Sequence, residues 1–357
     1  MNTPAGRQTA FPIANILADY DMGEVYDFEF LQGGMFLKPI LVTSATGKYV
    51  LRAHRFRTTE EDFQFQAETL EQLGARGFRC PQVMRTRNGA WGRSHDGVFW
   101  ALHEYVHGRL YTWREWLERR SDGDFLADIG KRVAKLHDAL ASVAPGGNSN
   151  LSKFLPPIQF RFLDDVRRQW QSDLDDLQVN ANLAARASRE VLIARRTEIE
   201  RHWDDLVKAT TALHICELPC QVVHGDVSPV NIVFAEGGFA LIDWDCVHFG
   251  NRLYDALGDI QNRGPVELSP PAEFNAVEVQ KYLAGYQNGT ERQLSDLELR
   301  CVSVFCFARQ LEDLRQRVAV LPTLNAANDE EYAALMERRI TMMRSIGKSN
   351  FKFSDIM

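Results

Sequence analysis

The sequence contains no long apolar stretch. Nowhere does it reach the run of about 18 apolar residues that a membrane-spanning helix needs. Its first residues, Met1 to Gln8, also lack the basic region followed by an apolar segment that marks a secretory signal. From these two absences we expect a cytoplasmic protein that has no membrane partner.

Paired cysteines and surplus positive charge are missing as well. The six cysteines form no Cys-x-x-Cys pair and no zinc-type spacing, so we interpret them as reduced packing residues. Acidic residues outnumber basic ones, 48 to 41, which gives a formal charge of −7. Because such a chain has no overall basic field to hold a polyanion, we expect no nucleic-acid partner.

In the first part of the chain, the pattern of apolar residues is typical of short strands, interrupted by one amphipathic helix. No internal repeat divides the 357 residues, and their length suggests two domains. The order of elements describes a small α+β lobe with five antiparallel strands, the first three forming a meander. The predicted strands cover residues 28–31, 39–43, 48–53, 82–85 and 98–102, and the predicted helix covers residues 60–73.

The pattern becomes helical after residue 108. Apolar residues recur every three or four positions between Phe125 and Leu140, as on the buried face of an amphipathic helix. Long polar stretches between residues 160 and 211 are typical of solvent-facing helices. We therefore predict an N-terminal lobe at residues 1–103, a hinge at residues 104–108 and a mostly helical lobe at residues 109–357.

One segment of the helical half, residues 222–245, breaks into short strands and carries polar side chains. It predicts a hairpin around Glu236-Gly237-Gly238, with Asn231 just before the first strand and Asp243 at the end of the second. Asp226 lies in the loop that precedes the hairpin. Three oxygen-bearing side chains are thus expected to converge, and carboxylate and amide oxygens suit Mg²⁺.

The spacing of these residues suggests their roles. Phosphoryl transfer needs a group that accepts the proton of the attacking hydroxyl and metal ions that neutralise the phosphates. In the protein-kinase catalytic loop, four residues separate the proton-accepting Asp from a metal-binding Asn, as they separate Asp226 from Asn231. Such enzymes place a second metal-binding Asp at the end of the next hairpin, which matches Asp243.

With these motifs the sequence resembles the aminoglycoside phosphotransferase and choline kinase-like family, kinases of small molecules that share the protein-kinase fold. The resemblance implies that Asp226 is the catalytic base and that Asn231 and Asp243 hold Mg²⁺. It also implies an α+β, bilobal protein-kinase-like fold, with an antiparallel five-stranded N-lobe that has one helix and a mostly helical C-lobe. The matching motifs are His224-Gly225-Asp226 to Asn231, Ile242-Asp243-Trp244 and Tyr254-Asp255.

The same resemblance implies an ATP site in the N-terminal lobe. The Gly33-Gly34 turn would cover the phosphates, although Met35 to Leu37 stand where small polar residues are usual. Arg52 replaces the usual lysine of the third strand, and its planar guanidinium would contact the α- and β-phosphates while paired with Glu68 of the following helix. The backbone of Glu104, Tyr105 and Val106 would meet the adenine.

Other polar residues near the motifs are given structural roles. We expect His224 to anchor the catalytic loop, Asp255 to order that loop by hydrogen bonds and His137 to be a satisfied core histidine. Asp245 lies two residues after Asp243, on the same face of an extended strand. It is interpreted as a third metal ligand or a hydrogen-bonded loop acid.

The expected function is ATP- and Mg²⁺-dependent phosphorylation of a hydroxyl group on a small molecule, by a monomer or homodimer. Residues 17–25 and 200–203 resemble type II homoserine kinases loosely, and sugars, amino sugars and aminoglycosides remain open as acceptors. ATP is not distinguished from GTP. The acidic residues Asp164, Asp165, Asp173 and Asp313 would suit an amine-bearing acceptor.

Two other functions compete with this one. Arg52 and the bulky residues after Gly34 suggest a nucleotide-binding pseudokinase that acts as a scaffold, although such a protein does not need Asp226, Asn231 and Asp243 together. A protein kinase is disfavoured because Trp244-Asp245 leads directly to Tyr254-Asp255, with no activation-loop motif between them.

Overall fold

The computed structural model describes residues 10–31, 38–54, 59–147, 163–179, 185–235, 238–261, 273–324 and 326–349. The chain divides into two compact units. The sequence-based boundary at residues 104–108 stays a prediction. In the structure, two later segments of the chain belong to the same unit as the N-terminal segment. The first unit comprises Met1–Arg109, Ser142–Phe154 and Ile232–His248, and the second comprises Leu110–Ala141, Leu155–Asn231 and Phe249–Met357.

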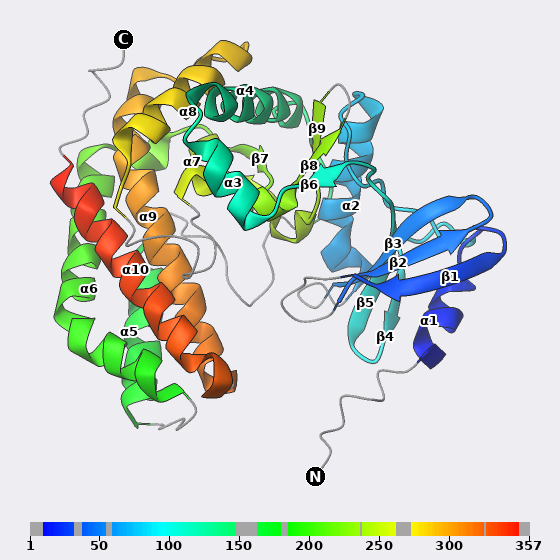
Figure 1. Ribbon diagram of the computed structural model, residues 1–357, viewed down its shortest axis with the longest axis horizontal. Helices are drawn as coiled ribbons and strands as arrows, with labels where there is room; N and C mark the ends of the chain where they lie inside the picture. Colours follow the sequence, from blue (N-terminus) through cyan, green and yellow to red (C-terminus); the bar gives the residue numbers. More distant parts are fainter. Residues whose placement is uncertain are drawn as a thin grey trace. The chain divides into compact units, whose positions relative to one another are not determined.

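An antiparallel five-stranded sheet forms the centre of the first unit, with the strand order β1-β2-β3-β5-β4 (Figure 1). The predicted meander of three strands is confirmed, and β2 and β3 are joined by a tight turn in which Ser44 pairs with Gly47. The strands are β1 (Val25–Phe30), β2 (Ile40–Ser44), β3 (Gly47–His54), β4 (Arg93–His95) and β5 (Val98–Glu104).

The fourth strand differs from the prediction. The segment 82–85 forms only an isolated bridge between Val83 and His103 and is not a strand, so that prediction was wrong. The fourth strand is β4, which pairs with β5 across a turn at Asp96 and Gly97. Both turn residues have positive φ, 49° and 74°. An Asp-Gly pair favours this backbone geometry in two-residue hairpins.

A helix packs on each face of this sheet. Helix α1 (Ala10–Leu17), which sequence analysis did not identify, contributes Ile16 to a cluster with Leu51 and Leu102. Helix α2 (Glu60–Ala75), which was predicted at 60–73, contributes Phe63 to a cluster with Ala101. Because successive strand residues point to opposite faces, Ala101 and Leu102 mark the two sides of the sheet.

The predicted hairpin of residues 222–245 is confirmed. Strands β8 (Ile232–Ala235) and β9 (Gly238–Leu241) are antiparallel, with Ile232 opposite Leu241. A short third strand, β6 (Arg109–Leu110), lies beside β8. The register therefore places the beginning of β8 and the end of β9 at the same end of the hairpin.

The second unit is mostly helical, as predicted. Strands β7 (Gln221–Val223) and β10 (His248–Gly250) form a two-stranded sheet. Among the helices of the described residues, none is both long enough and apolar enough to span a bilayer. The helices are α3 (Trp113–Arg120), α4 (Gly123–Leu140), α5 (Leu163–Val179), α6 (Arg186–Ala212), α7 (Arg252–Gln261), α8 (Ala276–Gly289), α9 (Asp296–Val320) and α10 (Asp329–Lys348).

Helices α4 and α8 approach each other closely in the second unit. A Cβ atom on Gly130 of α4 would overlap the carbonyl oxygen of Tyr282, and one on Gly285 of α8 would overlap that of Ala127. Only glycine permits backbones to come this near. The close packing gives a buried core that positions His137 of α4 next to the predicted catalytic loop.

Candidate active site

The predicted catalytic loop begins where the buried strand β7 ends. Gly225 has a φ of 86°, a conformation that glycine adopts without strain. The amides of His224 and Gly225 both donate to the carboxylate of Asp255 on α7, the second at 2.7 Å. Asp255 is buried, so these bonds are shielded from water. The prediction that Asp255 orders the loop by hydrogen bonds is confirmed.

His137 and His224 support the same loop from within the core. The His137 Nδ1 atom lies 2.7 Å from the hydroxyl of Tyr286, and its Nε2 atom lies 3.4 Å from Asp255. The amide of Asp226 donates to the Nδ1 atom of His224 at 3.2 Å. Both histidines are fully buried, as expected of a satisfied core histidine and a loop anchor.

Asp226 and Asn231 are brought together by the loop. The Asn231 Nδ2 atom donates to the backbone carbonyl of Asp226 at 3.0 Å and to its carboxylate at 2.9 Å. The Asp226 side chain is 37% exposed, so a small molecule can reach it. Because the amide nitrogen of Asn231 is committed to Asp226, its carbonyl oxygen is the atom that can serve as a metal ligand.

Arg309 of α9 also lies beside Asp226, which sequence analysis did not foresee. Its Nη2 atom is 3.6 Å from the Asp226 carboxylate. The one local signal is that Arg309 is the sole charged residue between Cys301 and Leu311. An isolated charge in an otherwise uncharged helical stretch needs a specific partner, because burying an unpaired charge is costly.

Arg52 and Asp243 form an ion pair within the first unit. The Arg52 Nη2 atom donates to Asp243 at 2.7 Å and to Asp245 at 3.1 Å. Burial alone would lower the pKa of Arg52, but Asp245 and Asp243 raise it overall. Asp243 has a φ of 63°, in the left-handed region that Asp tolerates better than most residues. This strained position, with the side chain 41% exposed, is typical of a functional site.

Asp245 is bonded to three side chains from two elements of the first unit, β3 and α2. Besides Arg52 of β3, it meets the His54 Nδ1 atom at 3.1 Å and the Gln66 side chain of α2 at 3.3 Å. His54 in turn lies 3.3 Å from the Nε2 atom of buried His103. These contacts fit the hydrogen-bonded loop acid that sequence analysis left open as one role of Asp245.

The expected pairing of Arg52 with Glu68 is wrong for this structure. Glu68 accepts a hydrogen bond from Gln64 at 2.6 Å and another from the amide of Gly146. Two helix positions correspond to a rotation of about 200°, so Glu68 lies on the opposite side of α2 from Gln66. The helix residue that reaches the cluster around Arg52 is therefore Gln66.

The other predicted nucleotide-binding residues are only partly described. Gly33 and Gly34 lie outside the described residues. The amides of Glu104 and Tyr105 donate to the carbonyls of Gln82 and Lys48, both within the first unit. These two bonds hold the backbone in line with β5, which ends at Glu104.

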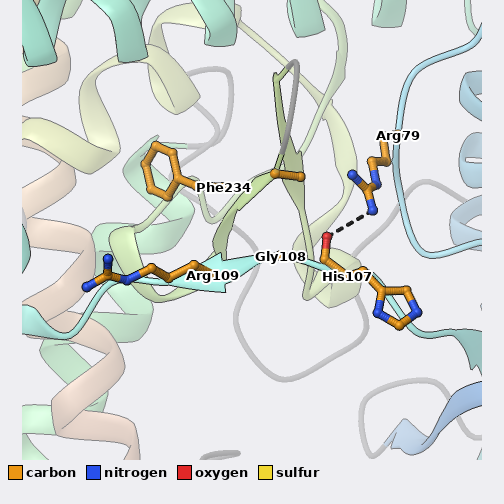
Figure 2. A pocket seen from close by; sticks show the side chains of 6 residues that line it. Arg79, His107, Gly108, Arg109 and Phe234 are labelled. Carbon is orange, nitrogen blue, oxygen red and sulfur yellow. Dashed lines mark hydrogen bonds between the residues drawn. The ribbon is translucent and has the colours of Figure 1, made fainter.

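A pocket of about 650 Å³ lies next to this segment (Figure 2). Arg79 donates to the carbonyl of His107 at 2.9 Å, while the Arg109 side chain extends away from this contact. The lining contains none of the predicted site residues, and its two arginines do not converge on one point. We assign it no chemistry. The lining residues are Arg79, His107, Gly108, Arg109, Phe234 and Ala235.

Of the acidic residues expected to suit an amine, Asp313 already has two arginine partners. Asp313 accepts hydrogen bonds from Arg317 at 2.8 Å and from Arg339 at 2.6 Å. Burial would raise its pKa, but these arginines hold the pKa well below its usual range. Asp164 and Asp165 are exposed on α5. Arg317 and Arg339 already neutralise the negative charge of Asp313, so the expectation that Asp313 binds the amine of an acceptor is corrected.

Comparisons with known proteins show which family the chain matches. Residues 27–298 match the model of a family described as the phosphotransferase enzyme family. A homoserine kinase of Xanthobacter autotrophicus is 25% identical over 274 residues, which cover 76% of this chain and 74% of that relative.

Two solved structures share the fold over nearly the whole chain. An amicoumacin kinase in complex with AMP-PNP and Ca²⁺ has a TM-score of 0.67 at 15% identity and covers 98% of each chain. A microcompartment-associated aminopropanol kinase has a TM-score of 0.65 at 18% identity, covering 93% of this chain and 95% of that one. The predicted protein-kinase-like fold is confirmed.

Proposed function

The chain belongs to the phosphotransferase enzyme family, and from that premise we propose that it transfers the terminal phosphoryl group of ATP to the hydroxyl of a small amino alcohol such as homoserine. The observation that carries the proposal is the bridge between Asp226 and Asn231, in which one amide group meets both the backbone and the carboxylate of Asp226. This bridge fixes a proton acceptor beside a metal-ligand oxygen, as phosphoryl transfer requires.

Asp226 acts on the acceptor. Its exposed carboxylate accepts the proton of the acceptor hydroxyl, the oxygen forms a bond to the γ-phosphorus, and the bond to the β-phosphate oxygen breaks to release ADP. Asn231 holds the carboxylate in place through its Nδ2 atom. Asp255 holds the loop backbone on which Asp226 stands.

Asn231 and Asp243 are the proposed Mg²⁺ ligands. Their oxygens are the hard donors that Mg²⁺ prefers, and when bound the ion neutralises charge on the β- and γ-phosphates. In the described residues, Arg52 contacts only one carboxylate oxygen of Asp243, and so the other oxygen remains for the metal.

The nucleotide is proposed to bind through the first unit. Arg52 is permanently charged and can contact phosphate oxygens through its fork of donors while orienting Asp243. We propose that the backbone of Glu104, Tyr105 and Val106 meets the adenine and that the Gly33-Gly34 turn covers the phosphates. Glu68 is not needed to orient Arg52, because Asp243 and Asp245 already do so.

The similarity to a homoserine kinase and the fold of an aminopropanol kinase support a small amino alcohol as the acceptor. The fold of an amicoumacin kinase shows that similar structures also act on other acceptors. The scaffold alternative finds no support there, since the family and these relatives are named as phosphotransferases or kinases.

The test is acceptor-dependent ADP release from purified protein with Mg·ATP. Homoserine, 3-aminopropan-1-ol, choline and an aminoglycoside are compared, and ³¹P NMR identifies the phosphate ester. Asp226→Asn is expected to lower kcat roughly 10²–10⁴-fold, the usual contribution of a positioned base. Asp176→Asn, an exposed acid of α5, is the matched control. ATP binding without turnover on any acceptor would refute the proposal and favour a scaffold.

A further inference from the structure

Arg309 occupies the one place where a positive charge lies beside the proposed catalytic base in the described part of the second unit. Helices α7 and α9 pack together there (Figure 1). The guanidinium of Arg309 lies 4.8 Å above the ring of Tyr254 on α7 and donates to its hydroxyl. Tyr254 therefore fixes the direction of the Arg309 side chain toward Asp226.

The contact between Arg309 and Asp226 is incomplete. Their closest atoms, Nη2 and Oδ1, are 3.6 Å apart, which is an ion pair but longer than a hydrogen bond. Among the described residues, the hydroxyl of Tyr254 is the hydrogen-bond acceptor for Arg309. A guanidinium has five N–H donors. Toward the described residues, most of the donors of Arg309 therefore make no hydrogen bond, and the side chain is 21% exposed.

The two acidic residues that follow Arg309 on α9 already have arginine partners. Asp313 is neutralised by Arg317 and Arg339. Glu312 pairs with Arg315 at 2.9 Å. Since Asp226 must accept a proton during the reaction, its charge is lost just as the acceptor oxygen attacks, while Arg309 keeps its own.

We infer that Arg309 binds a carboxylate of the acceptor, so that the preferred substrates are small hydroxy acids with the hydroxyl a few carbons from the acid group. The inference rests on the proposed function, because it takes Asp226 as the group that meets the hydroxyl. A hydroxyl on Asp226 and a carboxylate on Arg309 suit one short molecule, since both side chains are partly exposed and their closest atoms are 3.6 Å apart.

The chemistry favours a carboxylate over other groups. Arginine presents parallel N–H donors that match the two oxygens of a carboxylate, and such charge-assisted pairs are strong. An ammonium group gains no hydrogen bond from a guanidinium, which has no acceptor, and the nearby Asp313 is already paired with two arginines. Homoserine carries the required carboxylate, whereas 3-aminopropan-1-ol is the same molecule without it.

These two acceptors give the test. For the wild-type protein we expect kcat/KM to be at least about 30-fold higher with homoserine than with 3-aminopropan-1-ol, the size of one charge-assisted contact. Arg309→Gln should abolish this preference by raising KM for homoserine, leaving kcat/KM for 3-aminopropan-1-ol within about threefold of wild type. Arg309→Lys should restore part of the preference. Arg300→Gln, at an exposed position of the same helix, is the control.

Binding measurements separate this inference from the proposed function. Calorimetry on protein loaded with Mg·AMP-PNP should show homoserine binding that Arg309→Gln weakens, whether or not turnover occurs. Selective binding without turnover would refute the proposed reaction but support the carboxylate site. Turnover with equal preference for the two acceptors, or a loss of kcat for both in Arg309→Gln, would overturn the inference and leave the kinase activity standing. Thermal melting of each variant verifies that it folds.

Discussion

Each unit of the molecule holds an arginine against the carboxylate of a proposed site residue, and the two contacts differ. In the first unit, Arg52 donates to Asp243 at 2.7 Å and to Asp245 at 3.1 Å. In the second, Arg309 stands 3.6 Å from Asp226 without a hydrogen bond between them. We call these the closed contact and the open contact.

The difference does not come from protonation. The pKa of Arg52 is raised by Asp245 and Asp243 against the opposing effect of burial. The pKa of Arg309 is raised in the same way by Tyr254 and Asp226. Both are therefore fully charged. The closed contact uses its arginine to orient a carboxylate, and the open contact leaves its arginine available to a ligand.

Breaking the closed contact at Asp243 should have the largest effect. Asp243→Asn removes the charge that faces Arg52 and the proposed metal, and we expect turnover to fall roughly 10²–10³-fold. Asn also tolerates the left-handed backbone, so the unfolding free energy should fall by less than about 2 kcal/mol. Steady-state kinetics and chemical denaturation measure the two effects. Activity within tenfold of wild type would remove Asp243 from the metal site.

Asp245→Asn should weaken the closed contact, because Arg52 would then pair with a single carboxylate, as Arg309 does in the open contact. Arg52 would keep its ion pair with Asp243 but lose the one with Asp245. A nucleotide phosphate would then compete with one carboxylate instead of two for the Arg52 guanidinium. We expect KM for ATP to fall about threefold, the size of a partly exposed ion pair, with kcat nearly unchanged. If kcat instead fell by two orders of magnitude, Asp245 would be a metal ligand, the other role that its sequence position allows.

The smallest effect concerns the buried histidines behind the closed contact. Burial, His54 and Arg52 lower the pKa of His103 well below 6.5, against the raising effect of Asp245. The unfolded chain then binds a proton near pH 6.5 that the folded chain does not. Stability present above that pH is therefore lost as the pH falls, by up to roughly 1 kcal/mol between pH 6.5 and 5.5. Denaturation midpoints should show a shallower loss in His103→Gln, and an unchanged pH dependence would contradict this.

The comparison also shows where sequence patterns are informative. The contact between Asp226 and Asn231 spans five positions, and the strands of β2 and β3 are joined by a tight turn, so local spacing predicted both. The partners of Arg52 lie 191 and 193 residues away. Gln66 and Glu68 are both polar, so no local pattern in the sequence shows that Gln66 is the residue of α2 that contacts Asp245.

Two local features of the sequence indicate parts of the structure that were not predicted. The Asp96-Gly97 pair indicates a hairpin turn, which would have moved the fourth strand to β4. Arg309 is an isolated charge in α9, which suggests a partner without naming it. Asp226 becomes that partner only through the packing of α7 on α9, because Tyr254 of α7 directs the guanidinium.

The buried carboxylate of Asp255 has a consequence for the motions of the proposed catalytic loop. Its carboxylate ties the amides of His224 and Gly225 to α7 and to a fully buried histidine of α4. These two amides can exchange their hydrogens with water only when that part of the helical core opens as a unit. The segment that carries Asp226 has the backbone of a loop, but we expect it to open only as slowly as the helical core unfolds locally.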